Sequence, residues 1–341
     1  MIFAIILLLL LGFSVLLNIG HFISGVMRMD GGQSRHQVGP RLEELVVEDN
    51  DASDKIAVIT VDGVISGQMI DRSGFNMVDV IKAQLKRADK DSRVKAVILK
   101  VDSPGGEVLA SDDISEAIKK FQDESNKPVV VSMGSLAASG GYYISAPCRY
   151  IVANEMTITG SIGVIMSTYN VRGLMNKVGV QPVTFKSGKY KDMLSFSREP
   201  DSVTDEEKAM LQRLIDETYG KFKSVVANGR KQAHDKVKQN SRALVPNWTE
   251  YADGRVFSGK EAKDLGFVDD LGDFQHAVDR TKEIASIKQA NIVEYRQRVD
   301  LADLLGILGK SESRGIKVDL GLELPKLQAG RLYFLSPNYL N

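Results

Sequence analysis

Residues 94–133 read VKAVILKVDSPGGEVLASDDISEAIKKFQDESNKPVVVSM, and this stretch decides the fold. The apolar, β-branched run Val94–Val101 predicts a buried strand. Apolar residues then recur at helical spacing from Ile114 to Phe121, and Pro128–Met133 predicts a second strand. Strand, helix and strand in this order predict an α/β fold with parallel strands, because the helix returns the chain to the start of the sheet.

The same alternation continues on both sides of this stretch. Ile56–Val61 predicts a further strand, and the spacing of the apolar residues from Met77 to Leu85 predicts the helix that follows it. A long helix is predicted from about Thr204, because Thr204 and Glu207 have the spacing of a capping box. Its expected apolar stripe consists of Leu211, Leu214, Thr218, Phe222 and Val225. The predicted architecture is therefore a mostly parallel sheet with flanking helices.

Composition excludes several classes of protein. The chain has 341 residues, of which 43% are hydrophobic, so it is long and apolar enough for a sizeable core. Its 44 basic and 44 acidic residues leave no net positive charge to hold nucleic acid, and we expect no nucleic-acid partner. The single cysteine, Cys148, excludes an internal disulfide and any multi-cysteine metal site.

The N-terminal residues 1–27 predict a membrane anchor. No charged side chain occurs from Ile2 to Met27, and about 20 apolar helical residues span a bilayer. No basic residue precedes the run, which disfavours a cleaved signal peptide. Arg28 and Arg35 follow it, and by the positive-inside rule they would place that side in the cytoplasm.

Beyond the anchor, the sequence predicts three further parts. Residues 28–54 are polar and rich in acidic side chains, and they predict a linker. Residues 55–286 contain the alternating strands and helices and predict the main folded domain. Residues 287–341 predict a more polar C-terminal extension.

Two glycine-containing segments directly follow predicted strands. The first, Asp102–Gly106, contains Pro-Gly-Gly, and its backbone N–H groups could form half of an oxyanion hole. The second, Met133–Tyr143, surrounds Ser139 with small residues and places Gly140 after it, so that this amide could supply the other donor. A tight strand–helix turn and a small-residue helix start are the simpler alternatives for the two segments.

A serine nucleophile needs a base, and the histidines are poor candidates. His21 and His36 lie in the predicted anchor and linker, and His234 and His276 lie in charged helical stretches expected at the surface. A lysine or a carboxylate remains. The segment Phe185–Asp192 carries three lysines, of which one would act as a base if burial lowered its pKa by roughly 3 units from about 10.4. A solvated basic run is the simpler alternative.

Taken together, five motifs resemble the signal peptide peptidase A family of serine proteases, which shares a broad fold group with Clp-type proteases and crotonases. The resemblance covers roughly residues 56–271, and the order of the motifs makes it specific. The motifs are Ser103–Gly106, Ala138–Tyr143, Thr159–Val164, Ser187–Asp192 and the pair Phe257–Ala262 and Leu265–Asp269.

The resemblance implies that residues 55–286 form a catalytic domain, a protease with a Ser/Lys dyad that needs no metal and no cofactor. Ser139 matches the family's nucleophile and Lys191 its general base, with Lys189 as the competing base. Ser161 matches the hydroxyl that orients the lysine. Gly106 and Gly140 match the two oxyanion donors, with Gly105 as the alternative to Gly106.

The resemblance also implies a cellular location, a class of substrates and an assembly state. It predicts a single-pass protein of the cell membrane with an extracytoplasmic catalytic domain, which conflicts with the charge signal of Arg28 and Arg35. The expected substrates are apolar peptides, including remnant signal peptides, and a homo-oligomer with shared active sites is expected. The alternatives are a protease for one membrane-protein segment, a crotonase-like enzyme and a non-catalytic membrane scaffold.

The apolar run Leu332–Leu335 gives a separate hypothesis. An apolar C-terminal segment next to a protease groove could occupy the groove as a ligand or be cut in it. The simpler alternatives are a terminal strand that closes the fold and disorder.

Overall fold

The computed structural model describes residues 11–12, 14–15, 17–18, 39–69, 74–237, 241–297 and 332–335. The chain divides after Arg41 into two units. In the first unit, the described residues between 11 and 18 are helical. Most of the predicted anchor lies outside the described residues, and no helix within them has both the length and the apolar character needed to span a bilayer.

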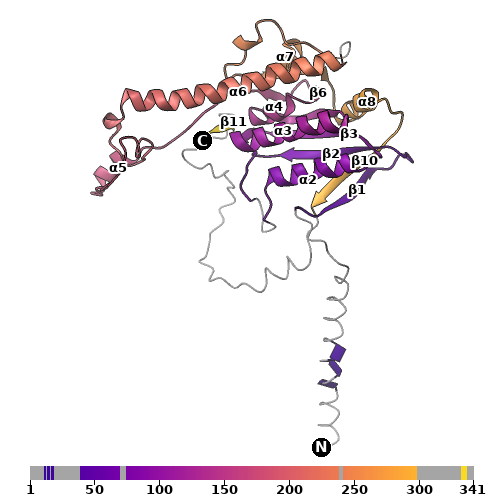
Figure 1. Cartoon of the computed structure of the whole chain (residues 1–341), viewed down its shortest axis with the longest axis horizontal. Coiled ribbons are helices and arrows are strands. Elements are labelled where there is room, and N and C mark those ends of the chain that lie inside the picture. The colour runs from indigo at the N-terminus through magenta and orange to yellow at the C-terminus, as the bar shows by residue number, and fades with distance from the viewer. Residues whose placement is uncertain are drawn as a thin grey trace, which may run out of the picture. The chain divides into compact units, whose positions relative to one another are not determined.

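A mostly parallel sheet organises the second unit, and nine of the described strands belong to it (Figure 1). From β10 to β9 all neighbouring strands are parallel, whereas β1 and β8 pair antiparallel with β10 and β7. The predicted α/β class with a mostly parallel sheet is therefore confirmed. The main order is β1 (Leu42–Glu48), β10 (Asn291–Gln297), β2 (Lys55–Asp62), β3 (Val94–Ser103), β5 (Val129–Ala138), β6 (Tyr150–Ala153) and β9 (Asp270–Leu271), with β7 (Ile158–Gly160) beside β5 and β8 (Val256–Ser258) beside β7.

Helices bury both faces of the sheet. Ala57, Ile59 and Val61 of β2 belong to the large core cluster that α2 (Met77–Lys90), α3 (Val108–Ser125) and α4 (Gly140–Ser145) cover. The alternate residues Ile56 and Val58 belong to a second cluster under α8 (Phe274–Ala285). Because side chains alternate across a strand, a strand buried on both faces has the continuous apolar sequence noted above.

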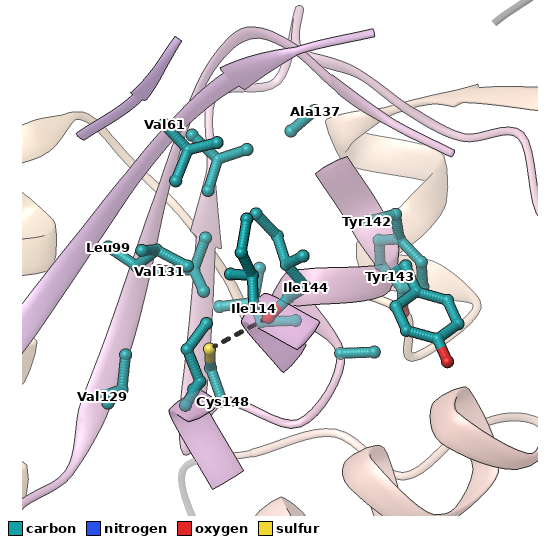
Figure 2. Close-up of a cluster of buried hydrophobic side chains, with 14 of the residues drawn as sticks. Val61, Leu99, Ile114, Val129, Val131, Ala137, Tyr142, Tyr143, Ile144 and Cys148 are labelled. Atoms are coloured by element: carbon teal, nitrogen blue, oxygen red, sulfur yellow. Dashed lines mark hydrogen bonds between the residues drawn. The ribbon is translucent and has the colours of Figure 1, made fainter. Parts of the chain in front are cut away.

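The large cluster continues beneath α4, the short helix that follows Ser139. In Figure 2, Leu99 and Val131 of neighbouring strands lie on the sheet side of the cluster, and Ile114 of α3 and Ile144 of α4 lie beside them. All four side chains are fully buried. The start of α4 is therefore fixed by close packing on both the sheet and α3.

Three strands lie outside the predicted catalytic domain. Residues 42–48, expected in the linker, form β1 at one edge of the sheet, and β10 and β11 (Tyr333–Leu335) lie in the expected extension. β1 has the sequence LEELVVE and is only partly buried. Edge strands commonly carry charged side chains, and for that reason the sequence of this strand resembled a linker. β11 pairs with β4 (Gly105–Glu107) in a separate two-stranded sheet.

The predicted long helix is α6 (Asp205–Val237), and its capping box is confirmed. Thr204 Oγ1 accepts a hydrogen bond from Glu207 N at 3.2 Å, and the Glu207 carboxylate accepts one from Thr204 N at 2.8 Å. The expected apolar stripe is buried only in part: Phe222 is fully buried, whereas Leu214 is 43% exposed. The first half of α6 extends beyond the core. The remaining short helices are α5 (Arg172–Lys177), η1 (Pro200–Ser202), η3 (Trp248–Glu250) and α7 (Gly259–Asp264).

A buried ion pair attaches α6 to the sheet. Arg230 of α6 and Asp269 are both fully buried and form a salt bridge, and Asp269 also accepts a hydrogen bond from Ile151 N of β6 at 2.8 Å.

The next residue, Asp270, binds three side chains that can carry positive charge: Lys263 at 2.8 Å, His276 at 2.8 Å and Arg280 at 2.9 Å. Burial alone would raise the pKa of Asp270, but the hydrogen bonds from these three side chains outweigh it and hold this pKa well below its usual range.

Candidate active site

Ser139 lies at the junction of β5 and α4 in a conformation that residues with a side chain rarely adopt. Its φ is 54° and its ψ is −115°, and such a conformation costs on the order of 1–3 kcal/mol. Two backbone hydrogen bonds of 2.8 Å hold the turn, one from Ser139 N to Gly160 O and one from Tyr143 N to Ser139 O. Ser139 thus follows the carboxyl end of a central parallel strand, where α/β proteins commonly bind ligands.

The Ser139 hydroxyl is buried and unpaired. The residue is 1% exposed, and its Oγ has no hydrogen-bond partner among the described residues. Leaving a buried hydroxyl unpaired costs about 1–3 kcal/mol. A strained serine whose hydroxyl is left free has the features of a reactive group.

The backbones of the two glycine segments touch next to Ser139. A Cβ atom added to Gly140 would lie 3.0 Å from both Gly105 Cα and Gly106 N, and one added to Gly105 would lie 2.5 Å from Gly140 N. Only glycine allows this approach. Gly140 is the first residue of α4, so its N–H has no partner within the helix.

The N–H of Gly106 faces away from the neighbouring segment at Ile65. Ile65 N donates to Gly105 O and Glu107 N donates to Ile65 O, both at 2.8 Å, so the residues on either side of Gly106 bond in that direction. Because backbone groups alternate along a strand, the Gly106 N–H points to the opposite side. The amides of Gly106 and Gly140 are therefore adjacent.

The register of β7 places Ser161 near Ser139. Ala138 is paired with Gly160, so the two serines follow the ends of neighbouring parallel strands. Ser161 is 4% exposed, has a φ of 52°, and donates its N–H to Arg255 O at 2.7 Å. The structure thus brings Ser161 into the region of the candidate nucleophile, and its orienting role stays a prediction.

The lysines of residues 185–192 differ in their partners. Lys186 forms a salt bridge with Asp192 at 2.6 Å, and Lys189 forms one with Glu206 at 2.9 Å. Hydrogen bonds with Tyr190 and Glu206 raise the pKa of Lys189, which is the opposite of what a general base needs. Lys191 is exposed, and its side-chain amine has no hydrogen bond or ion pair with any described residue, although its backbone N–H donates to Gly188 O at 3.4 Å.

Within one chain, the structure does not join Lys191 to Ser139, whose Oγ contacts no described donor or acceptor. Lys191 belongs to residues 166–203, a segment here called the lysine lobe. In Figure 1 its helix α5 lies beyond the N-terminal end of α6, whereas α4 lies near the middle of that helix. Apolar side chains of the lobe are widely exposed: Tyr169, Leu174, Val178, Val180, Val183, Phe185 and Phe196, with Phe185 at 94%.

The side chains of the two histidines in the catalytic domain interact with residues other than Ser139. His234 Nδ1 lies 3.1 Å from Ser241 Oγ, and His276 Nε2 lies 2.8 Å from Asp270. Both side chains are partly buried rather than fully exposed. Neither pairs with Ser139, as the sequence predicted.

One positioning residue was missed by sequence reasoning. Ser103 Oγ accepts a hydrogen bond from Gly105 N at 3.1 Å and donates one to Gly63 O at 2.6 Å, so it fixes the turn that presents Gly106. A serine two residues before a turn glycine commonly makes this local bond, and that spacing was the available signal.

Comparisons with known proteins identify the family of this chain. The model of peptidase family S49 matches residues 121–288. A protein of Enterococcus faecium provisionally named signal peptide peptidase SppA is 36% identical over 75% of this chain and 71% of its own length. A provisionally named protease of Methanocaldococcus jannaschii is 39% identical over 81% of both chains. A solved structure, that of a mutant of the 1510-N membrane-bound stomatin-specific protease, aligns with a TM-score of 0.43 and 14% identity over 72% of this chain and all of its own.

A serine on a strained strand–helix turn, beside two convergent backbone amides on an α/β sheet, is the arrangement of a serine hydrolase. The sequence similarity to known proteases identifies one family within this class. The chain belongs to peptidase family S49, the family of signal peptide peptidase SppA and protease IV, and it is a serine protease.

Proposed function

We propose that the chain is a membrane-anchored Ser/Lys-dyad endopeptidase that cleaves apolar peptides, remnant signal peptides among them, outside the cytoplasm. Ser139 is the nucleophile, Lys191 the general base, and Ser161 orients the lysine amine. The observation that carries the proposal is the buried, unpaired Ser139 hydroxyl next to the amides of Gly106 and Gly140. The substrate class is supported by the name of the Enterococcus relative.

The mechanism follows from these roles. Uncharged Lys191 takes the proton of Ser139 as Oγ attacks the peptide carbonyl, and the two amides stabilise the oxyanion, each by about 3 kcal/mol. The protonated lysine then donates the proton to the leaving amine. Water, deprotonated by the same lysine, hydrolyses the acyl-enzyme and frees Ser139.

A second copy of the chain completes the site in this proposal. Lys191 and Ser139 are not in contact within one chain, and the lysine lobe exposes apolar side chains that a neighbour would cover. Contact with that neighbour would remove the amine from water, which favours its uncharged form. We therefore assign the lysine of each site to an adjacent protomer of a homo-oligomer.

Single substitutions test the dyad. In the full-length chain in detergent, Ser139→Ala and Lys191→Ala should each lower kcat for an apolar peptide by at least about 10³-fold, in the range seen when dyad or triad members are removed. Lys189→Ala is the matched control and should retain activity. Loss of activity in Lys189→Ala with activity retained in Lys191→Ala would reassign the base.

Mixing the two inactive variants tests the shared site. A mixed oligomer contains sites that combine Ser139 of the Lys191→Ala chain with Lys191 of the Ser139→Ala chain. Activity should therefore return on co-assembly and be greatest at an equal ratio. An inactive mixture that has exchanged subunits, as shown by mass spectrometry of the intact oligomers, would place both residues of a site on one chain.

A further inference from the structure

One peptide unit links the two serines of the candidate active site to the turn at residues 252–256. The carbonyl of Gly160 accepts a hydrogen bond from Ser139 N at 2.8 Å, and the next N–H along the chain, that of Ser161, donates to Arg255 O at 2.7 Å. Both groups belong to the planar Gly160–Ser161 peptide. A shift of the Arg255 carbonyl would therefore tilt this peptide, and with it the Ser161 side chain.

The backbone at Gly160 and Ser161 is held by its neighbours. Gly160 has a φ of 80° and Ser161 a φ of 52°, so two consecutive residues lie in the left-handed region. For a serine this conformation is unfavourable, and the surrounding contacts must impose it. A Cβ at Gly160 would lie 2.5 Å from the Phe257 ring and 3.1 Å from Arg255 O. The strand β8 and the turn before it therefore confine the backbone at Ser161.

The turn that supplies the Arg255 carbonyl is fixed at both of its ends. At one end Ala252 is fully buried, and its carbonyl accepts a hydrogen bond from the Tyr219 hydroxyl of α6. At the other end Val256 begins β8, which pairs antiparallel with β7. Residues 253–255 span the distance between these two fixed points. The position of the Arg255 carbonyl therefore depends on how these three residues are held.

Asp253 and Arg255 close the turn with three hydrogen bonds. The Asp253 carboxylate accepts one from Arg255 Nε at 2.7 Å, one from Arg255 Nη2 at 2.6 Å and one from the Arg255 backbone N–H at 3.2 Å. A bidentate pair fixes direction as well as distance. The hydrogen bonds from Arg255 lower the pKa of Asp253 to about 2, so the pair is charged at neutral pH.

The exposure of this ion pair argues against a role in overall stability. Both side chains are 49% exposed, and ion pairs in contact with water contribute little to the free energy of unfolding. The pair nevertheless fixes the residue whose carbonyl holds Ser161 N. Its contribution is therefore expected in the geometry of the site.

We propose that Asp253 and Arg255 are positioning residues of the active site. Their ion pair holds the Arg255 carbonyl, and through it the Gly160–Ser161 peptide, so that the Ser161 hydroxyl faces the lysine amine. The inference rests on the proposed Ser/Lys function and adds two residues that act through Ser161. Loss of the pair frees the turn, displaces the Ser161 hydroxyl and slows the chemical step, while peptide binding and the fold are kept.

Kinetics of Arg255→Met test the proposal. With an apolar peptide and the full-length protein in detergent, kcat should fall about 10-fold or more, because a displacement of about 1 Å can cost about 10²-fold. KM and the midpoint of chemical denaturation should stay at their wild-type values. Arg255→Lys, which keeps the charge and one hydrogen bond to Asp253, should recover part of the lost kcat. A rise in KM with unchanged kcat would show that Arg255 contacts the substrate and would overturn the inference.

Arg93→Met is the matched control. Arg93 forms the same three hydrogen bonds with Asp91, also two residues before it. This second pair precedes β3, whereas Ser139 follows the carboxyl end of the neighbouring parallel strand β5. The control should keep the wild-type kcat, and an equal fall in both variants would contradict a role specific to the active site.

Combination with Ser161→Ala tests the route of the effect. Because Arg255 acts through Ser161 in this proposal, the double variant should lose clearly less activity than the product of the two single losses. A loss equal to that product would refute the route. Wild-type kcat in Arg255→Met, with Ser139→Ala inactive, would overturn the inference and leave the proposed function in place. A wild-type protein that does not hydrolyse apolar peptides would instead reject the proposed function.

Discussion

The close approach of Gly140 to the neighbouring turn predicts the effect of one methyl group on catalysis. In Gly140→Ala, the new Cβ would lie 3.0 Å from Gly105 Cα and from Gly106 N, and 2.7 Å from Ser111 Oγ. The serine side chain can rotate away, but the two backbone atoms can separate only if the two segments move apart. The substitution therefore acts on the spacing of the two amides that we propose as oxyanion donors.

The size of the effect follows from these distances. Carbon atoms in contact prefer about 3.5 Å or more, so the two segments must part by about 0.5 Å. Catalytic groups tolerate displacements of about 0.5 Å, and loss of one oxyanion donor costs about 10²–10³ in kcat. We expect kcat to fall about 10- to 100-fold, while overpacking lowers the free energy of unfolding by about 1–3 kcal/mol.

Steady-state hydrolysis of an apolar peptide, with chemical denaturation on the same samples, measures both effects. Gly220→Ala is the matched control, because a Cβ at Gly220 in α6 meets no atom within 4 Å and alanine favours a helix by about 1 kcal/mol. It should leave kcat unchanged and not lower stability. A folded Gly140→Ala enzyme with wild-type kcat would refute the assignment of these amides to the oxyanion hole.

Three further predictions follow from other contacts. Arg230→Met should lower the free energy of unfolding by about 3–5 kcal/mol in chemical denaturation, because it leaves Asp269 buried and without its ion-pair partner; a loss below about 1 kcal/mol would contradict this. Asp270 has a lowered pKa in the folded state, so its stabilisation is present above its unfolded pKa near 3.8 and is lost as the pH falls below that value. The acid-induced fall in Tm should accordingly be shallower in Asp270→Asn, and an unchanged slope would refute the assignment. If the lysine lobe forms the contact of the proposed homo-oligomer, Phe185→Asp should lower the mass measured by light scattering and make activity fall on dilution, whereas Met156→Ser, at a residue 84% exposed outside that lobe, should change neither.

Local sequence patterns predicted the central elements of the fold. β2, β3 and β5 are continuous apolar runs because both of their faces are covered, and α2 and α3 have apolar residues at helical spacing. The start of α6 could be predicted from the sequence because a capping box joins residues only three positions apart. β1 was not found, since an edge strand with charged side chains resembles a linker.

The sequence by itself determined which groups are available for chemistry: a serine among small residues, glycines after two strands, and no histidine nearby. Only the tertiary structure decided which of them meet. Ser161 lies near Ser139 because β7 pairs with β5, and Phe334 lies against Tyr143 and Phe222 because β11 pairs with β4. Such contacts join residues far apart in the chain, and their free energy depends on packing and strand register, which no short stretch of sequence encodes.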